Sequence, residues 1–423
     1  MRVGIALSFL DFRNDIRRVI VEILREHEVV LFLPRGQAEA MRSLVPDGAE
    51  VRLIDEQTSS FRVRLWKRFF HFFGLVPRSV GNYYLMERFL ILQGAVGFRR
   101  RLNLLSFDLA MHFPKWLSYD KYINGLSYKA ATPIDDIDRF VLLTRIVDDS
   151  FLSRLLREER DVRVYVYSWD HPCKHRQFSR RVDYLVWSEG ISDDLVELQK
   201  IPREKIRSIG ASQLGYLYEF LEQDGNPKPY DFPYIYLGCF AGIREMALQE
   251  VEIILRISKV VSSSRPDVRL VVRPYPMVRE NAIYDSLRDA SNIIMDDEYL
   301  RQDLSTAEDK IQDKLSKIYH AQAFLHLGTT MGLEACFTDT PSFIIDFGYY
   351  AGAGRLSIEH GIRQYQNKKY LMDRTPTNVL RSEEDVRQML GSLKEPAYLS
   401  VNKHIRRIFP LTSFDGFARE LVD

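Results

Sequence analysis

Short apolar runs alternate with segments of helical spacing along most of the chain. The run from Arg2 to Phe9 precedes apolar positions spaced three and four residues apart between Asp11 and His27, and a second run covers Val29 to Leu33. Runs of this length are typical of buried β-strands, and the intervening spacing is typical of an amphipathic helix. The opening of the chain therefore predicts a strand–helix–strand unit, the element from which parallel sheets are built.

The same alternation continues in both halves of the chain. In the first half we expect further strands at residues 51–54, 139–144, 162–168 and 184–187, with a helix over 148–157. In the second half we expect strands at 234–237, 268–272, 293–294, 323–327 and 342–345, with helices over 245–261, 311–321 and 331–337. The pattern predicts an α/β fold with two Rossmann-like domains, each a parallel sheet with helices on both faces.

A polar segment rich in turn-forming residues separates the two halves. Residues 224–232 read Asp-Gly-Asn-Pro-Lys-Pro-Tyr-Asp-Phe and show no periodicity, which is typical of a connection between domains. We therefore expect a first domain over 1–223, a second domain over 224–395 and a helical tail over 396–423. Within the first domain, the pattern predicts a helical insertion at about 61–125.

Composition and charge exclude several classes of protein. The 423 residues include 59 Lys and Arg against 58 Asp and Glu, so bulk attraction to nucleic acid is not expected. Cys173, Cys239 and Cys336 lie far apart, which argues against a disulfide framework or a zinc site and favours a reducing, cytoplasmic location. No stretch approaches the roughly 18 to 20 apolar residues of a membrane-spanning helix, and the first residues predict a strand rather than a signal peptide.

The predicted insertion differs in charge from the rest of the chain. Between Phe61 and Arg101 there are nine basic residues, one acid (Glu87) and ten aromatic residues. One interpretation is a helical face that simply packs on the first domain and leaves the arginines in water; its members are Leu65, Phe69, Phe72 and Phe73. We favour the alternative, in which residues 61–101 attach to an anionic membrane surface, and so expect a protein held peripherally at the inner face of the membrane.

The strongest local motif lies between the apolar run 323–327 and the helix predicted at 331–337. A turn between a strand and a helix presents backbone N–H groups, which can bind a diphosphate. Glu334, about one turn into the helix, could reach ribose hydroxyls. In the alternative interpretation, a threonine only caps the helix and Glu334 completes a capping box or a salt bridge. The residues of this candidate donor site are Gly328, Thr329, Thr330, Met331, Gly332 and Glu334.

A second candidate for donor binding follows the strand predicted at 268–272. Arg273 and Tyr275 stand in the sequence Arg-Pro-Tyr-Pro, at the strand end where open α/β sheets bind their ligands. Arg273 could offer two nitrogens to phosphate oxygens. The alternative is a surface arginine in a turn made rigid by prolines.

A third motif could supply a general base. Asp170 and His171 follow the apolar run 162–168, and either can accept a proton from a hydroxyl group. Alternatively, Asp170 caps a loop and His171 packs against Trp169. Asp11, after the first strand, is a rival candidate of the same kind. We find no metal-ligand spacing and expect no metal requirement.

Together these motifs resemble those of the GT-B glycosyltransferases. The similarity rests on SWDHP, VDYLVWSEG, VRPYP and HLGTTMGLEA, covers Asp138 to about Asp346, and is closest to bacterial surface-polysaccharide enzymes related to CDP-glycerol glycerophosphotransferases and Kdo transferases. Tyr275 stands where relatives often carry a histidine between the two prolines, so this chain departs from the pattern there.

The resemblance implies two domains facing across a cleft, with the nucleotide in the second and the acceptor in the first. Donor contacts would then come from Arg273, Tyr275 and the 328–334 motif, and acceptor chemistry from the region of Asp170 and His171. The implied reaction moves a sugar from a nucleotide sugar to a hydroxyl of a surface glycan or lipid-linked glycan, with inversion and without a metal or other cofactor. Alternatives are a nucleotide-sugar 2-epimerase and a non-catalytic nucleotide-sugar-binding protein on the same fold.

Overall fold

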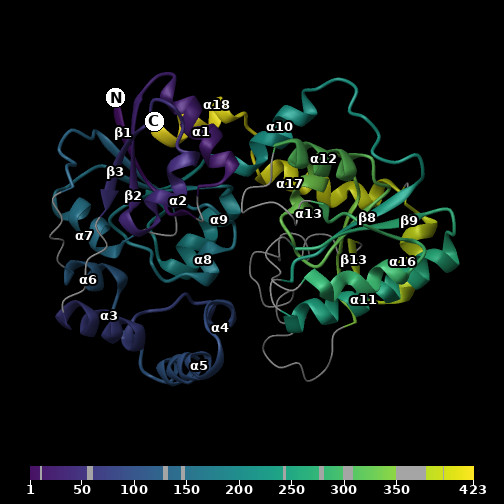
Figure 1. Ribbon diagram of the computed structural model, residues 1–423, viewed down its shortest axis with the longest axis horizontal. Coiled ribbons are helices and arrows are strands. Elements are labelled where there is room, and N and C mark those ends of the chain that lie inside the picture. Colours follow the sequence, from purple (N-terminus) through teal and green to yellow (C-terminus); the bar gives the residue numbers. More distant parts are fainter. Residues whose placement is uncertain are drawn as a thin grey trace. The chain divides into compact units, whose positions relative to one another are not determined.

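The chain forms two compact units. Met1–Tyr216 and Phe409–Asp423 make up the first unit, and Leu217–Ile408 make up the second (Figure 1). The computed structural model describes residues 1–9, 12–54, 61–126, 132–143, 148–241, 244–275, 281–298, 308–348, 378–393 and 395–423.

The first unit contains a seven-stranded sheet in the order β3-β2-β1-β4-β5-β6-β7. Every neighbouring pair is parallel. The order reverses between β1 and β4, so the switch point, where parallel sheets bind ligands, lies at the carboxyl ends of these two strands. The strands are β1 Arg2–Ala6, β2 Glu28–Pro34, β3 Glu50–Ile54, β4 Arg139–Leu143, β5 Val162–Tyr165, β6 Asp183–Val186 and β7 Ile206–Ser208.

Helices connect these strands and complete the first unit. Helix α18 returns from the end of the chain to pack on α1, with the Phe414 ring 5.2 Å from the Arg18 guanidinium and the Phe417 ring 5.2 Å from that of Tyr165. The helices outside the insertion are α1 Asn14–Leu24, α2 Ala38–Met41, α7 Asp149–Arg157, α8 His171–Lys174, α9 Glu189–Asp194, α10 Gly215–Leu221, which runs into the second unit, and α18 Phe414–Val422.

The insertion is helical, as its sequence predicts. It comprises α3 Phe61–Phe73, α4 Val80–Gly94, α5 Gly97–Met111 and α6 Tyr119–Asn124. Aromatic stacking holds it together: the Phe70 ring lies 4.1 Å from that of Tyr122, and the Trp66 ring 5.5 Å from that of Phe69. The insertion thus has an apolar interior of its own.

The second unit contains a six-stranded parallel sheet in the order β10-β9-β8-β11-β12-β13. Its order reverses between β8 and β11, which places the switch point at the carboxyl ends of these strands. The strands are β8 Tyr234–Gly238, β9 Arg269–Arg273, β10 Ile293–Met295, β11 Phe324–His326, β12 Ser342–Ile345 and β13 Val379–Leu380.

One face of this sheet packs against α12 and α13. Tyr236, Val271 and Phe324 of the sheet form a buried cluster with Ile318 and Ala335 of the two helices. Helix α11 packs against β9 and against α16. The described helices of the unit include α11 Arg244–Ser264, α12 Glu308–Tyr319, α13 Met331–Phe337, α16 Glu383–Gly391 and α17 Ser400–Ile408, with 3₁₀ helices at Asn281–Asp289 and Pro396–Leu399.

The predicted α/β class and the two parallel sheets are confirmed, but the domain limits differ from those expected. The chain passes from the first unit to the second within α10, not at 223–224. Residues of the turn-rich segment pack inside the second unit, because Pro227 O accepts a hydrogen bond of 2.7 Å from Ser316 Oγ and Asn226 O lies 3.0 Å from His320 Nε2. The expected tail, 396–423, is divided: α17 belongs to the second unit and α18 to the first.

Candidate functional site

The candidate donor motif lies at the switch point of the second sheet. Its turn, Leu327 to Thr330, follows β11 and lies beside Gly238, the last residue of β8. A Cβ atom at Gly238 would lie 2.8 Å from Phe324 Cζ and 3.2 Å from Thr329 Cγ2. Only glycine therefore allows the turn to lie this close to the end of β8.

The turn has an unusual backbone and little internal capping. Gly328 has φ +106°, a region that favours glycine, and its N–H donates to His326 Nδ1 at 3.0 Å. Thr330 precedes α13 but its hydroxyl caps nothing, and Thr329 Oγ1 accepts only a long 3.4 Å bond from Met331 N–H. Within the described ranges, the N–H groups of Thr329 and Thr330 donate to no other group.

The imidazole of His326 holds this turn in place. Its side chain is fully buried, and a Cβ atom at Gly332 would lie 2.7 Å from the imidazole Cε1. Because Nδ1 accepts from Gly328, the neutral ring carries its proton on Nε2. The sequence analysis did not predict this role of His326. The signal was the small residue six positions later, which makes room for the ring.

Glu334 is the one acid of the motif, and it is not part of a capping box. Its Oε1 atom accepts from Lys314 Nζ of α12 at 2.6 Å, which agrees with the salt-bridge alternative. The residue is only 8% exposed, and its Oε2 atom is buried without a hydrogen-bond partner among the residues that the structure describes. An unmatched buried carboxylate oxygen is costly, so this atom is suited to accept a hydrogen bond from a ligand.

The guanidinium group of Arg273 is buried and contacts a carboxylate of the protein. It is 6% exposed, at the end of β9 beside Gly238, and its Nη1 atom contacts Asp296 Oδ2 at 2.7 Å. Asp296 also accepts from Tyr236 Oη and, at 2.8 Å, from Lys317 Nζ. Burial by itself raises the pKa of Asp296, but the Arg273 and Lys317 cations outweigh it and hold the pKa below its usual value.

The structure overturns the alternative of a surface arginine in a turn, because the Arg273 side chain is buried and paired with Asp296. Contact of Arg273 with a phosphate stays a prediction. The sequence could not show this, because Asp296 and Lys317 lie on other elements. Tyr275 is half-buried beyond the end of β9, and Pro276 lies outside the described residues.

A buried acid holds the loop that follows β8. Glu250 of α11 accepts from the Phe240 N–H at 2.9 Å and from Tyr284 Oη at 2.6 Å. Burial raises the pKa of Glu250 to about 7, so its proton is exchanged near neutrality. The sequence reading missed Glu250. The signal available was an acid among the apolar positions of a predicted helix.

In the first unit, Asp170 forms an ion pair. Its carboxylate contacts Lys174 Nζ and accepts from Ser168 Oγ at 2.8 Å. Burial raises the pKa of Asp170, but the charges of Lys174 and His171 and these hydrogen bonds together hold it below its usual value. The carboxylate is therefore ionised and held at the carboxyl side of β5.

The role of His171 as a base stays a prediction, but the alternative packing of its ring is corrected. His171 begins the short helix α8, and its ring lies 4.7 Å from that of His175 rather than against Trp169, which packs on Phe409. Asp170 precedes α8 but its side chain makes no capping bond. Asp11 lies outside the described residues, so its place is not given.

Asp15, which follows Asp11 closely in the sequence, is a carboxylate that the sequence analysis did not consider. Asp15, in the first turn of α1, is buried and accepts from Ser212 Oγ at 2.6 Å and from Tyr167 Oη at 3.0 Å. Burial raises the pKa of Asp15 above its usual value. Because α1 follows β1, and Tyr167 and Ser212 follow β5 and β7, this cluster marks the carboxyl edge of the first sheet.

The described residues contain neither a metal-binding cluster nor a membrane-spanning helix. Among them there is no group of three or more His, Cys, Asp or Glu side chains arranged to hold a metal ion. No helix within the same ranges is both long enough and apolar enough to cross a bilayer.

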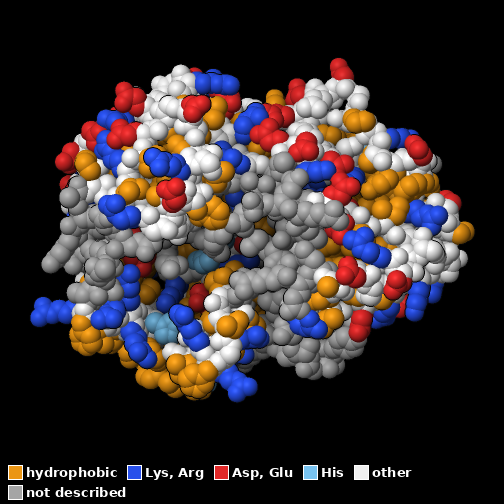
Figure 2. Space-filling view, in the orientation of Figure 1, with side chains coloured by type: hydrophobic (Ala, Val, Ile, Leu, Met, Phe, Trp, Pro, Cys, Tyr) orange, Lys and Arg blue, Asp and Glu red, His pale blue; other side chains and the backbone are white. Residues whose placement is uncertain are grey.

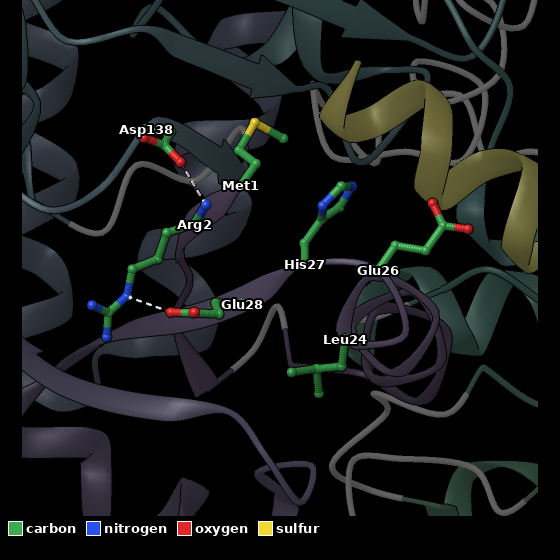
Figure 3. A pocket seen from close by; sticks show the side chains of 7 residues that line it. All are labelled: Met1, Arg2, Leu24, Glu26, His27, Glu28 and Asp138. Atoms are coloured by element: carbon green, nitrogen blue, oxygen red, sulfur yellow. Dashed lines mark hydrogen bonds and ion pairs between the residues drawn. The ribbon is translucent and has the colours of Figure 1, made fainter.

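A surface hollow of about 600 Å³ lies elsewhere in the first unit, at the amino ends of its strands. Figure 3 shows Arg2 pointing to Glu28 there, while the Arg2 N–H bonds to Asp138. The ion pair measures 3.4 Å and the hydrogen bond 2.7 Å. Parallel sheets bind ligands at the opposite, carboxyl edge, so we assign no role to this hollow.

Known structures share this architecture at low sequence identity. No protein-family model matches the chain, and no curated protein matches it. A putative UDP-N-acetylglucosamine 2-epimerase from Listeria monocytogenes aligns with TM-score 0.52 and 9% identity, over 100% of this chain and 94% of that one. UGT89C1 of Arabidopsis thaliana, solved with UDP, aligns with TM-score 0.51 and 10% identity, over 100% and 98%.

A third similar structure is the glycotransferase of kitacinnamycin, with TM-score 0.51, 11% identity and coverage of 100% of this chain and 97% of that one. At such identities the similarity concerns the fold. The expected fold class is confirmed: the chain is an α/β protein with the two-domain GT-B fold.

Proposed function

We propose that this protein is an enzyme that uses a nucleotide sugar and transfers the sugar to a hydroxyl of a surface glycan or lipid-linked glycan. The observation that carries the proposal is the Oε2 atom of Glu334, which is buried and has no hydrogen-bond partner in the described part of the chain, next to the Gly328 turn at the switch point of the second sheet. Similar structures solved with UDP, including UGT89C1, support the choice of a nucleotide.

The turn would hold the diphosphate of the donor. The N–H groups of Thr329 and Thr330 can donate to phosphate oxygens, and their hydroxyls add two further donors. Gly238 keeps the approach open, and the Arg273 cation lies next to it at the end of β9. These groups would stabilise the charge that develops on the leaving diphosphate, without a divalent cation.

Glu334 would select the nucleoside. Its Oε2 atom can accept a hydrogen bond from a ribose hydroxyl, while Lys314 orients the side chain through Oε1. A carboxylate that accepts from a hydroxyl cannot accept from a C–H group, so a deoxyribose lacking that hydroxyl would bind less tightly.

In the transfer step, the acceptor oxygen would attack the anomeric carbon, and the bond to the diphosphate would break. The acceptor proton would pass to a base of the first unit, and the nucleoside diphosphate would leave with the bonding electrons. In-line attack of this kind inverts the anomeric centre. Asp170 and His171 remain our proposed bases, with Asp11 as the rival.

The first experiment measures binding through the Glu334→Gln variant. Because a ligand that binds only the folded protein raises its apparent stability, UDP, GDP, CMP, CDP and dTDP are compared by thermal shift. We expect at least one nucleotide to stabilise the wild type, and the variant to bind it about tenfold or more weakly through loss of a hydrogen bond to a charged group.

Glu298→Gln is the matched control, because Glu298 also pairs with a lysine of α12, Lys310, at 3.1 Å but lies outside the site. Equal nucleotide binding by wild type, Glu334→Gln and Glu298→Gln would place the nucleotide elsewhere.

The alternative enzyme is a nucleotide-sugar 2-epimerase, which acts on the donor alone. Its support is the similarity to the Listeria monocytogenes structure, whose TM-score equals or exceeds those of the glycotransferase and UGT89C1. Incubation of the protein with donor and no acceptor separates the two: an epimerised nucleotide sugar would exclude the transferase. Donor hydrolysis or transfer would instead exclude a purely binding protein.

A further inference from the structure

Exposed apolar side chains concentrate in the insertion of the first unit. Of the 16 large hydrophobic residues that are exposed in the described ranges, 11 lie between Phe61 and Trp116. Figure 2 shows hydrophobic side chains gathered along the lower left edge of the view, where Figure 1 places α3 and α5, with Lys and Arg side chains between them. These residues are Phe61, Leu65, Leu75, Val80, Val96, Phe98, Leu102, Leu105, Leu109, Phe113 and Trp116.

Helix α5 carries the most regular part of this surface. Phe98, Leu102, Leu105 and Leu109 are 80%, 53%, 67% and 52% exposed. Their spacing of four, three and four residues puts them within about 60° of arc on one side of the helix. We call these four side chains the α5 stripe. Phe107, on the opposite side, is 2% exposed.

The exposure of the α5 stripe does not result from incomplete packing inside the insertion. The insertion already buries Phe70, Tyr83 and Phe107 to 4%, 2% and 2% exposure, and Phe107 lies 5.4 Å from the ring of Tyr84. A helix that packs one side and exposes a row of leucines on the other has a second apolar face. Such a face in a folded protein marks an interaction surface.

Unpaired positive charge surrounds the stripe. Arg99 and Arg101 flank it on α5, and Arg62, Arg64, Lys67 and Arg68 are exposed on α3, which packs against α5. Within the described part of the chain, none of these six side chains forms an ion pair with an acid. Elsewhere in the first unit arginines are commonly paired, as Arg139 is with Asp161 at 2.5 Å.

We propose that α5 and the exposed side of α3 dock on an anionic lipid bilayer. The α5 stripe would enter the boundary between headgroups and acyl chains, and the basic side chains would lie among the phosphates. Charge decides the occupant: a second copy of this surface would bring the six cations against their like, whereas anionic headgroups are complementary. This inference does not depend on the identity of the donor or of the reaction.

The structure shifts the surface relative to the sequence prediction. The expected window, 61–101, includes only the first residue of the stripe. Phe69 and Phe73, expected as part of the exposed or packed face, lie 4.5 Å apart in a cluster with Trp116. The apolar contact with the bilayer is therefore assigned to the α5 stripe, of which Leu102, Leu105 and Leu109 lie beyond the window.

Vesicle flotation of the full chain tests the proposal. The wild type is mixed at low salt with vesicles of phosphatidylcholine alone or of phosphatidylcholine with phosphatidylglycerol. We expect flotation with the anionic vesicles. The variant Leu102→Ser/Leu105→Ser should bind them about tenfold or more weakly through loss of buried apolar area. Arg99→Glu/Arg101→Glu should weaken binding by at least about fivefold for each residue, because each change removes an attracted charge and adds a repelled one.

Leu248→Ser is the matched control, since Leu248 is 45% exposed on α11 of the second unit. It should float like the wild type, and circular dichroism should show that all variants are folded. Sedimentation velocity is run on the same proteins without lipid. The proposal is overturned if the wild type does not float, if all variants float equally, or if the stripe variants only dissociate an oligomer.

Discussion

The two sheets end differently at their switch points. At the carboxyl edge of the first sheet, two described carboxylates are each bonded by two side chains of the protein: Asp15 by Ser212 and Tyr167, and Asp170 by Ser168 and Lys174. At the carboxyl edge of the second sheet, Glu334 has one buried oxygen that no described residue contacts through a hydrogen bond.

The difference indicates which groups the fold already holds by hydrogen bonds and which can still bond to a ligand. A carboxylate with two protein partners is positioned, and its charge is set before any ligand arrives. An oxygen atom without a protein partner favours the binding of a ligand that supplies the missing hydrogen-bond donor. We therefore expect the second sheet to provide binding, and the first to provide an oriented base.

The largest expected effect concerns the first sheet. Asp170→Asn and His171→Ala should each lower kcat by about 10²- to 10⁴-fold, the usual contribution of a general base, with little change in the KM for the donor. Steady-state kinetics at saturating donor measures this.

Asp183→Asn is the control for that prediction, because Asp183 also contacts a lysine, Lys205 at 3.2 Å, but at the amino end of β6. It should keep the wild-type kcat. If Asp170 and His171 variants also keep it while Asp11→Asn does not, the base belongs to the loop after β1.

The next effect concerns pH and stability. The pKa of Glu250 is about 7 in the folded protein, above the ordinary 4.5 of a glutamate. Its contribution to the free energy of unfolding is therefore complete below about pH 4.5 and is lost as the pH rises through 7, by about 3 kcal/mol. The variant Glu250→Gln cannot ionise, so it should gain stability relative to the wild type over this range.

Urea denaturation of both proteins at acidic and alkaline pH measures the change. Asp15→Asn in the first unit should shift in the same direction, because burial also raises the pKa of Asp15. A difference between wild type and Glu250→Gln that stays constant with pH would show that Glu250 does not titrate in this range.

The smallest effect compares two glycines. A Cβ atom at Gly238 would lie 2.8 Å from Phe324, and one at Gly4 of the first sheet 2.9 Å from Phe140. Both glycine-to-alanine variants should lose about 1–3 kcal/mol of stability through overpacking. Only Gly238→Ala should also weaken nucleotide binding, because its methyl group would displace the turn at Thr329. Equal binding by the two variants, measured by calorimetry, would contradict the proposed donor site.

Local sequence predicted the fold well, since strand and helix positions follow from periodicity. The strand at 342–345 and the helix at 331–337 match β12 and α13 at both ends. Local sequence does not predict features that depend on contacts between residues far apart in the chain. The unit boundary within α10 depends on Phe220 packing 5.8 Å from the ring of Tyr319, far along the chain.

The same reason explains what the site prediction contained and omitted. The motif from Gly328 to Glu334 is continuous, so its sequence alone indicated a turn before a helix. The pairing of Arg273 with Asp296, the clamp of Glu250 by Tyr284, and the burial of Asp15 arise between elements that are distant in sequence. Periodicity contains no information about such pairs.

The return of α18 to the first unit has a consequence for biosynthesis. Phe414 lies against Gly215, where a Cβ atom would be 2.7 Å from its ring, and Phe417 packs on Tyr165. A ribosome makes these two phenylalanines only after the whole of Leu217–Ile408. The unit whose synthesis begins first is thus completed last. Until then its nascent chain has an uncovered apolar surface on α1 and β5, where chaperones would be expected to act.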